Sequence, residues 1–203
     1  MMINNNSLPL VSICIPTYNA STSILDTLQC VINQTYKNIE IIICDNCSTD
    51  NTVELIRELS DSRINLSINN ENLGMVGNFN MVLSRANGTY VKLLCADDII
   101  TNDCVEKEVK VFLNNPDKNL VMVTAEKFVI NARGETLFTK RFLGKEGIYD
   151  GIKVLRKSFR YGTNIFGEPG AVLFLNDAVK RAGEIQIPES LTYVVDMQLY
   201  AQI

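Results

Sequence analysis

Short apolar runs recur along the chain at intervals of about 25 to 30 residues. They are rich in β-branched residues and nearly continuous rather than alternating, a pattern typical of strands that are covered on both faces. The pattern therefore predicts five buried strands, at Leu10–Ile15, Ile39–Cys44, Ile64–Ile68, Tyr90–Leu94 and Leu120–Thr124.

Helical periodicity fills the gaps between these runs. Ser23 and Asp26 have the spacing of a capping box before the first helix, and Asp50 or Asn51 opens the second. The alternation of strands and helices predicts an α/β fold, a mostly parallel, doubly wound sheet with helices on both faces. The four apolar stripes are Ile24, Leu25, Leu28, Val31 and Ile32; Val53, Ile56 and Leu59; Met75, Phe79, Val82 and Leu83; and Val105, Val109, Phe112 and Leu113.

The regular alternation of predicted strands and helices ends after Thr124. A hairpin is predicted around the turn Asn131–Gly134, then a helix over Asp150–Tyr161, a glycine-rich stretch and a strand over Ala171–Leu175. We therefore divide the chain into residues 1–125 and a smaller extension, 126–203, as two halves of one domain. The chain ends at Ile203 within a predicted helix, from which we expect a C-terminal truncation.

Composition narrows the possible functions. The net charge is −4 and no Lys/Arg block is longer than a pair, which argues against nucleic-acid binding. No stretch of about 18 apolar residues occurs and the N-terminus lacks the order of a signal peptide, so we expect a cytoplasmic protein. Histidine is absent, which excludes Ser-His-Asp and Cys-His catalysis and leaves acid–base chemistry to carboxylates.

Cys44 and Cys47 have the spacing of a redox pair. That chemistry requires a helix N-terminus directly after the first cysteine, whereas Cys44 ends a predicted strand. We expect both to be reduced thiols, with Cys44 buried.

Polar residues follow each of the first four predicted strands. Because ligands of open α/β sheets bind beyond the carboxyl ends of the strands, these residues mark the candidate site. Turn formation and helix capping account for Ser48, Thr49 and Asp50, which precede a helix, but do not account well for Asp97 and Asp98. The residues after successive strands are Pro16, Thr17, Tyr18 and Asn19; Asp45 and Asn46; Asn72 and Gly74; and Asp97 and Asp98.

Asp97 and Asp98 are adjacent carboxylates, and a bound cation would relieve their repulsion. Mg²⁺ and Mn²⁺ take one or two carboxylates together with phosphate oxygens and water. A solvated pair that caps the next helix is the alternative. The P-loop and GxGxxG motifs are absent, so the simplest use of this edge is a nucleoside diphosphate bridged to the two aspartates by a metal.

Four stretches in this order resemble the family 2 glycosyltransferases of the GT-A fold: Val11–Asn19, Gln34–Tyr36 leading into Glu40–Thr52, Asn69–Asn80 and Tyr90–Asp98. The resemblance implies that Pro16, Thr17, Tyr18 and Asn19 line the nucleotide pocket and that Asp45 and Asn46 lie near the base and ribose. Asn72, Gly74 and Ala96 would belong to the same nucleotide-sugar site. Asp97, with Asp98 beside it, would take the metal-binding DXD position.

In the second half, Glu168–Phe174 resembles the segment under the acceptor site, and Asp196 takes the position of the family's catalytic base. Without the resemblance, helix capping would be the favoured role of Asp196, and Glu168 is its main rival as the base. Three residues depart from the sequence pattern of the family. Cys95 replaces the first Asp of its fullest acidic motif, Asn46 replaces a frequent Asp, and Val195 replaces a frequent Glu.

The resemblance implies an inverting transfer of a sugar from a nucleoside-diphosphate sugar to an acceptor hydroxyl, with Mg²⁺ or Mn²⁺ as cofactor. A UDP-sugar donor, a saccharide or lipid-linked saccharide acceptor, peripheral membrane association and a place in bacterial surface polysaccharide synthesis are further expectations. Three alternatives stay open: a sugar-phosphate nucleotidyltransferase, a phosphoacceptor receiver domain, and a fragment that binds nucleotide sugars without turnover.

Overall fold

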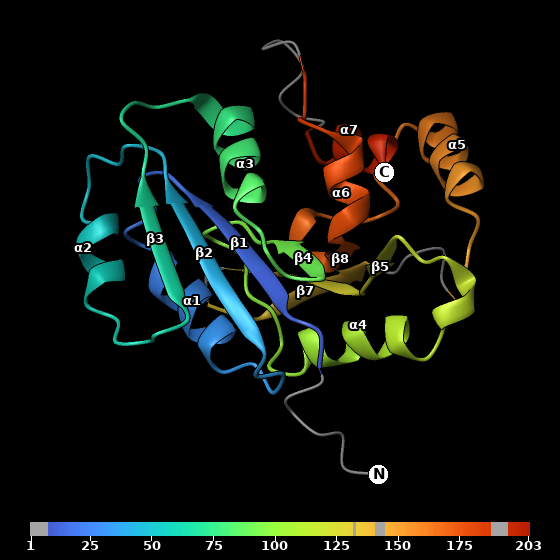
Figure 1. The fold of residues 1–203 in the computed structure, drawn as a ribbon, viewed down its shortest axis with the longest axis horizontal. Coiled ribbons are helices and arrows are strands. Elements are labelled where there is room, and N and C mark those ends of the chain that lie inside the picture. The colour runs from blue at the N-terminus through green and yellow to red at the C-terminus, as the bar shows by residue number, and fades with distance from the viewer. Residues whose placement is uncertain (1–7, 132, 141–144, 188–194) are drawn as a thin grey trace.

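The computed structural model describes residues 8–131, 133–140, 145–187 and 195–203. Its main feature is a six-stranded sheet with the strand order β3-β2-β1-β4-β8-β5 (Figure 1). These strands are β1 (Val11–Thr17), β2 (Ile39–Asp45), β3 (Ile64–Ile68), β4 (Tyr90–Leu93), β5 (Met122–Thr124) and β8 (Val172–Leu175). All five runs predicted as strands are strands, with ends shifted by one or two residues.

Four neighbouring strands run parallel, as the apolar runs predicted. β1 pairs with β2 on one side and with β4 on the other, and β2 pairs with β3. β8 is antiparallel to both β4 and β5 and separates them. Because β8 comes from the second half of the chain, both predicted halves contribute strands to the same sheet.

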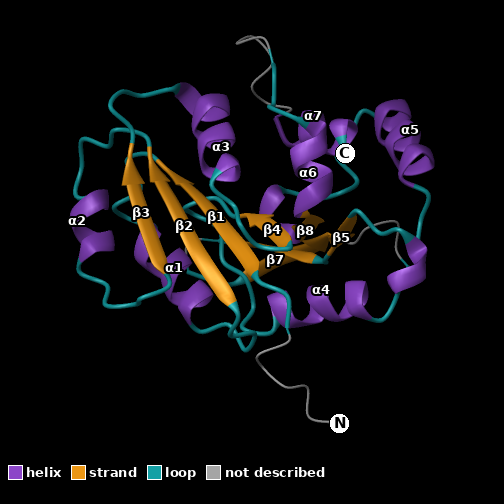
Figure 2. Cartoon of the chain, in the orientation of Figure 1, coloured by secondary structure: helices purple, strands orange, loops and turns teal. Residues whose placement is uncertain are grey.

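Helices cover both faces of the sheet (Figure 2). Side chains of β1 alternate between the two layers: Ile13 and Ile15 pack with α1, α2 and α4, whereas Cys14 packs with α3, α6 and α7. The helices are α1 (Ile24–Ile32), α2 (Thr52–Arg57), α3 (Gly74–Ser84), α4 (Cys104–Leu113), α5 (Gly151–Tyr161), α6 (Asn176–Ala182) and α7 (Val195–Gln202), with 3₁₀ turns at Pro116–Lys118 and Pro169–Ala171. Within the described residues, no helix is both long and apolar enough to cross a bilayer.

Some local predictions at the helices were wrong. Ser23 is the N-cap of α1, but its side chain makes no capping hydrogen bond, so the predicted capping box does not form. Asn51 is the N-cap of α2 without a side-chain capping hydrogen bond, and the carboxylate of the preceding Asp50 accepts a hydrogen bond from the Thr52 amide at 3.0 Å. Met75 and Leu113 belong to predicted apolar stripes but are exposed, since they lie at the ends of α3 and α4 beyond the packed faces.

The predicted hairpin consists of β6 (Lys127–Ile130) and β7 (Thr136–Lys140), paired outside the main sheet. Asn131 holds the turn, because its side-chain oxygen accepts hydrogen bonds from the amides of Arg133 and Glu135. The predicted helix at 150–161 is also confirmed as α5, with Asp150 as its N-cap. Ala132 of the predicted turn and Val194, which precedes the predicted base segment, lie outside the described residues.

Lys92 is a fully buried lysine on β4, and it joins the parallel strands to the antiparallel ones. Its ammonium forms an ion pair of 3.0 Å with the buried Glu108 of α4. It also donates hydrogen bonds to the carbonyl oxygens of Gly170 at 2.8 Å and Val172 at 3.3 Å. A buried ammonium is tolerated because one carboxylate and two carbonyls replace its hydration shell.

We predict that Lys92→Met lowers the free energy of unfolding by about 3–5 kcal/mol, because it leaves the Glu108 carboxylate buried without its ion pair. The double variant Lys92→Met/Glu108→Leu should recover most of that loss. Urea denaturation of the three proteins measures both effects. Equal stability of Lys92→Met and wild type would contradict the role of this ion pair.

Candidate active site

The carboxyl ends of the parallel strands meet at one edge of the sheet. Thr17, the last residue of β1, pairs with Asp45 at the end of β2, and Asp45 pairs with Ile68 at the end of β3. β4 ends at Leu93, beside Cys14 of β1. The loops after these strands are therefore neighbours, as the sequence predicted, and they form one continuous rim.

Asp45 fastens the first two loops of this rim together. Its carboxylate is buried and accepts hydrogen bonds from the Thr17 hydroxyl at 3.1 Å, the Ser48 hydroxyl at 2.6 Å and the Ser48 amide at 2.8 Å. The Ser48 hydroxyl in turn accepts a hydrogen bond from the amide of Asn19 at 2.8 Å. Two non-glycine residues of these loops, Asn19 and Cys47, have left-handed backbone conformations, a conformation favoured for Asn over most residues.

Asn46 fastens the third loop to the second. Its side-chain amide donates hydrogen bonds to the side-chain oxygen of Asn72 at 2.7 Å and to the carbonyl of Gly74 at 3.2 Å. Its side-chain oxygen accepts from Asn69 at 3.0 Å, and Asn69 also donates to Asn78 of α3 at 3.0 Å. Since Asn46 is buried, it holds the rim in shape through this amide network.

The predicted nucleotide-sugar residues fall into two groups. Tyr18, Asn19, Asn72, Gly74 and Asp97 are exposed, so a ligand can reach their side chains or backbone. Pro16, Thr17, Asp45, Asn46 and Ala96 are buried beneath them. The structure thus brings all ten residues to one edge of the sheet, but it separates those that a ligand can reach from those that support them.

Cys44 and Cys47, which we predicted to be reduced thiols, lie in different environments. Cys44 is buried at the end of β2, as predicted, with its sulfur 3.1 Å from the Ser67 hydroxyl, and burial raises the pKa of its thiol. Cys47 is half-buried, and both cysteines are free thiols. A thiol whose pKa is raised is a poor nucleophile, so Cys44 is part of the packing between the sheet and α3.

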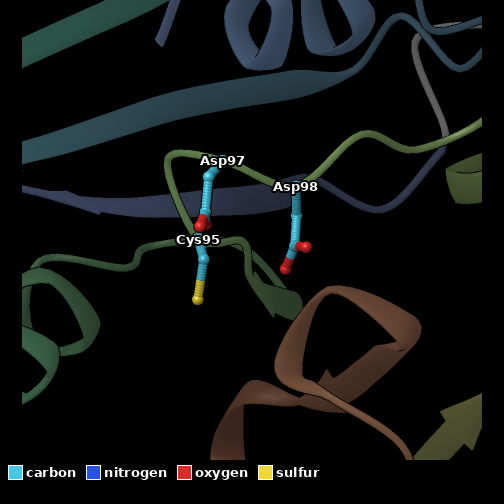
Figure 3. Close-up of side chains that lie close together, drawn as sticks. All are labelled: Cys95, Asp97 and Asp98. Atoms are coloured by element: carbon cyan, nitrogen blue, oxygen red, sulfur yellow. The ribbon is translucent and has the colours of Figure 1, made fainter. Parts of the chain in front are cut away.

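Cys95, Asp97 and Asp98 project from the turn that follows β4 (Figure 3). The Cys95 sulfur and one carboxylate oxygen each of Asp97 and Asp98 lie within 4.8 Å of one another. Two hydrogen bonds fix the turn: the Asp98 amide donates to the Cys95 carbonyl at 3.1 Å, and the buried Thr27 of α1 donates to the Asp98 carbonyl at 2.9 Å. The turn is therefore rigidly attached to the helix beneath it.

Burial and neighbouring charges change the pKa values of the side chains in this turn. Burial raises the pKa of the Asp98 carboxyl and the neighbouring charge of Asp97 raises it further, while the ammonium of Lys127 lowers it. Burial, together with Asp98, Asp97 and Asp196, raises the pKa of Cys95 to about 12. Cys95 is therefore a neutral thiol at physiological pH, and the two aspartates are the oxygen donors of this turn.

Asp196 lies in the first turn of α7, close enough to the acidic turn for its charge to reach Cys95. Its carboxylate accepts hydrogen bonds from the side-chain amide of Asn164 and from the Met197 amide. Burial raises the pKa of Asp196, while these hydrogen bonds lower it. The structure thus places Asp196 near Cys95 of the acidic turn, although about 100 residues separate them in the sequence.

Lys127 is a residue of the site that the sequence analysis missed. It opens β6 and forms an ion pair with Glu168, the rival candidate for the base. Its positive charge also lowers the pKa of both Asp98 and Asp196. Lys127 belongs to no recognisable sequence motif. The one signal that could have identified it is its position shortly after the fifth predicted strand.

Known proteins resemble this chain in sequence and in fold. Residues 12–181 match the model of the family Glycosyl transferase family 2. The UDP-Glc:alpha-D-GlcNAc-diphosphoundecaprenol beta-1,3-glucosyltransferase WfgD of Escherichia coli is 40% identical over 106 residues, which cover 52% of this chain and 42% of WfgD.

Three solved structures, of two proteins, share the fold. The S. aureus TarS 1–349 structure superimposes with a TM-score of 0.70 at 17% identity, covering 96% of this chain and 55% of that one. Its complex with UDP-GlcNAc gives a TM-score of 0.66 at 18% identity, over 96% and 53% of the two chains. The mannosyltransferase PcManGT from Pyrobaculum calidifontis, in complex with GDP-Man and Mn2+, gives 0.62 at 21% identity over 90% and 49%. The chain thus spans about half the length of each of these three solved chains.

Proposed function

This chain belongs to glycosyl transferase family 2, and we propose that it transfers a sugar from a nucleoside-diphosphate sugar to an acceptor hydroxyl, with inversion at the anomeric carbon. The observation that supports the proposal is the acidic Asp97-Asp98 turn at the same sheet edge as the exposed rim residues, with Asp196 near Cys95 of that turn. The family match favours this activity over the nucleotidyltransferase and receiver-domain alternatives.

The donor and acceptor are inferred from the relatives. WfgD is named for UDP-glucose and a diphosphoundecaprenol-linked acceptor, and TarS has been solved with UDP-GlcNAc. These names support a UDP-sugar donor and a lipid-linked saccharide acceptor, in the synthesis of a bacterial surface polysaccharide. We place the reaction at the inner face of the membrane, where such an acceptor would be reached from the cytoplasm.

Asp97 and Asp98 fit a divalent cation. Their carboxylate oxygens are close together, and Asp98 carries a raised pKa that a neighbouring positive charge would lower. Mg²⁺ and Mn²⁺ prefer oxygen donors, which the neutral thiol of Cys95 does not supply. When bound, such a cation offsets the negative charge that develops on the departing diphosphate.

The proposed reaction is a single in-line displacement. The acceptor oxygen forms a bond to the anomeric carbon while the bond from that carbon to the diphosphate breaks, and the diphosphate leaves with the electron pair. Asp196 takes the proton of the acceptor hydroxyl as general base. Asn164 orients the Asp196 carboxylate through its hydrogen bond, and the positive charge of Lys127 lowers the pKa of that carboxyl. One displacement inverts the anomeric configuration.

We predict that Mn²⁺ binds at least about tenfold more tightly when UDP is present, because two carboxylates need phosphate oxygens to complete the coordination shell. Calorimetric titration of Mn²⁺ with and without UDP measures the difference. Asp98→Ala should abolish it, whereas Asp103→Ala, at a partly exposed aspartate in the N-cap position of α4, should leave it unchanged. Tight Mn²⁺ binding without nucleotide, unaffected by Asp98→Ala, would contradict the proposed metal site.

We predict that Asp196→Asn lowers kcat by roughly 10²–10⁴-fold and leaves the KM for the donor nearly unchanged, because a base acts only on the acceptor proton. Glu168→Gln is the matched control, since it also removes one carboxylate near Lys127. Initial rates with UDP-glucose and a lipid-linked GlcNAc acceptor give both constants. Wild-type turnover of Asp196→Asn, with turnover lost in Glu168→Gln, would move the role to Glu168.

The pH dependence of kcat offers a separate test. Asp196 works as a base only when ionised, and burial raises its pKa, so the acidic limb of the profile should lie above the ordinary range of an aspartate. Asn164→Asp keeps the oxygen that accepts hydrogen bonds from the Phe166 and Gly167 amides, but it replaces a donor to Asp196 with a negative charge. We predict that this variant moves the acidic limb upward by about 1–3 pH units. A uniform loss of rate with an unmoved limb would argue against Asp196.

A further inference from the structure

Helix α5 concentrates positive charge on a chain whose net charge is −4. Four of its eleven residues are exposed cations, and the helix contains no acidic residue between Gly151 and Tyr161. The cations line a shallow hollow together with Tyr161; they are Lys153, Arg156, Lys157 and Arg160. The local charge is therefore opposite in sign to that of the molecule as a whole.

The solvent-facing side of α5 is also apolar. Ile152 and Phe159, seven residues apart, lie on one stripe of the helix and are 64% and 67% exposed. Tyr161, at the other margin of the cations, is 66% exposed. Ile148 and Tyr149, just before the helix, are exposed as well. Large apolar side chains thus flank the cations on both margins.

The opposite side of α5 is already occupied. Val154 and Ser158 are buried, and the Ser158 hydroxyl lies 3.8 Å from the sulfur of Met197 on α7. Figure 1 shows α5 at the outer edge of the molecule, with α6 and α7 between it and the parallel strands. The basic and apolar side, defined by Ile152, Lys153, Arg156, Lys157, Phe159, Arg160 and Tyr161, is called the α5 face below.

We propose that the α5 face binds the surface of an anionic lipid bilayer. Anionic headgroups would pair with the four cations, and Ile152, Phe159 and Tyr161 would enter the boundary between headgroups and acyl chains. Lysine and arginine side chains are long enough to reach the headgroups while apolar neighbours lie deeper. A nucleic acid would use the cations but would leave Ile152 and Phe159 in water.

The position of the α5 face suits a lipid-linked acceptor. Because α5 packs on α7, and α7 carries Asp196, a bilayer at this face would bring the acceptor headgroup to the Asp196 side of the site. This consequence rests on the proposed function, whereas lipid binding itself does not.

Co-sedimentation with large vesicles tests the proposal on the 203-residue chain, without donor or acceptor. We predict binding to vesicles of phosphatidylcholine with 30% phosphatidylglycerol, at least about tenfold weaker binding to pure phosphatidylcholine, and a loss of binding as salt rises. Arg156→Glu/Arg160→Glu and Ile152→Ser/Phe159→Ser should each weaken binding about tenfold or more. Circular dichroism checks that the variants are folded.

The matched control is Lys107→Glu/Lys110→Glu, which makes the same charge change at exposed lysines of α4. It should bind anionic vesicles nearly as well as wild type. Equal losses for the α4 and α5 variants would show a non-specific charge effect and overturn the proposal. Equal binding to neutral and anionic vesicles would also overturn it. So would the absence of vesicle binding together with light scattering that shows a dimer for the wild type and a monomer for Phe159→Ser.

UDP binding, measured by calorimetry on the same preparations, separates this inference from the proposed function. Variants of the α5 face should retain it. UDP binding with no vesicle binding removes the lipid inference alone, and vesicle binding with no UDP binding removes the proposed function alone.

Discussion

The buried ammonium of Lys92 bonds to the two parts of the structure that have to stay in register. Its ion pair with Glu108 ties β4 to α4, and its hydrogen bonds to Gly170 and Val172 tie β4 to the segment that enters the sheet as β8. Gly170 packs so closely on the acidic turn that a Cβ there would lie 3.0 Å from Leu94 and 3.4 Å from Asp98. The buried charge of Lys92 therefore helps to fix the position of residues 170–172 relative to the acidic turn.

The site itself is a balance of like and opposite charges. Asp98 and Asp196 are both partly buried and both carry raised pKa values, chiefly because burial disfavours the charged form of each carboxyl. Lys127 on the hairpin lowers both pKa values and also forms an ion pair with Glu168. Partly buried charged side chains stabilise a fold less than apolar side chains of similar size would. A binding site for a charged substrate would nevertheless require them.

Much of the fold was predictable because its signals are local. Continuous apolar runs identified the parallel strands, and the parallel direction placed Thr17, Asp45 and Asp97 on one edge. The long-range contacts were not predictable in the same way. The insertion of β8 between β4 and β5 and the position of Lys127 depend on pairings across about 40 to 80 residues, which no periodicity reports. The family resemblance, not the spacing, brought Asp196 to attention.

The central claim is that the rim of strand-end loops holds the nucleotide part of the donor. Nuclear magnetic resonance of the ¹⁵N-labelled chain, titrated with UDP in the presence of Mg²⁺, tests it without any need for turnover. The account predicts that the perturbed amides cluster at residues 17–19, 45–48, 72–74 and 96–98. Perturbations confined to other parts of the chain, or none at saturating UDP, would contradict it.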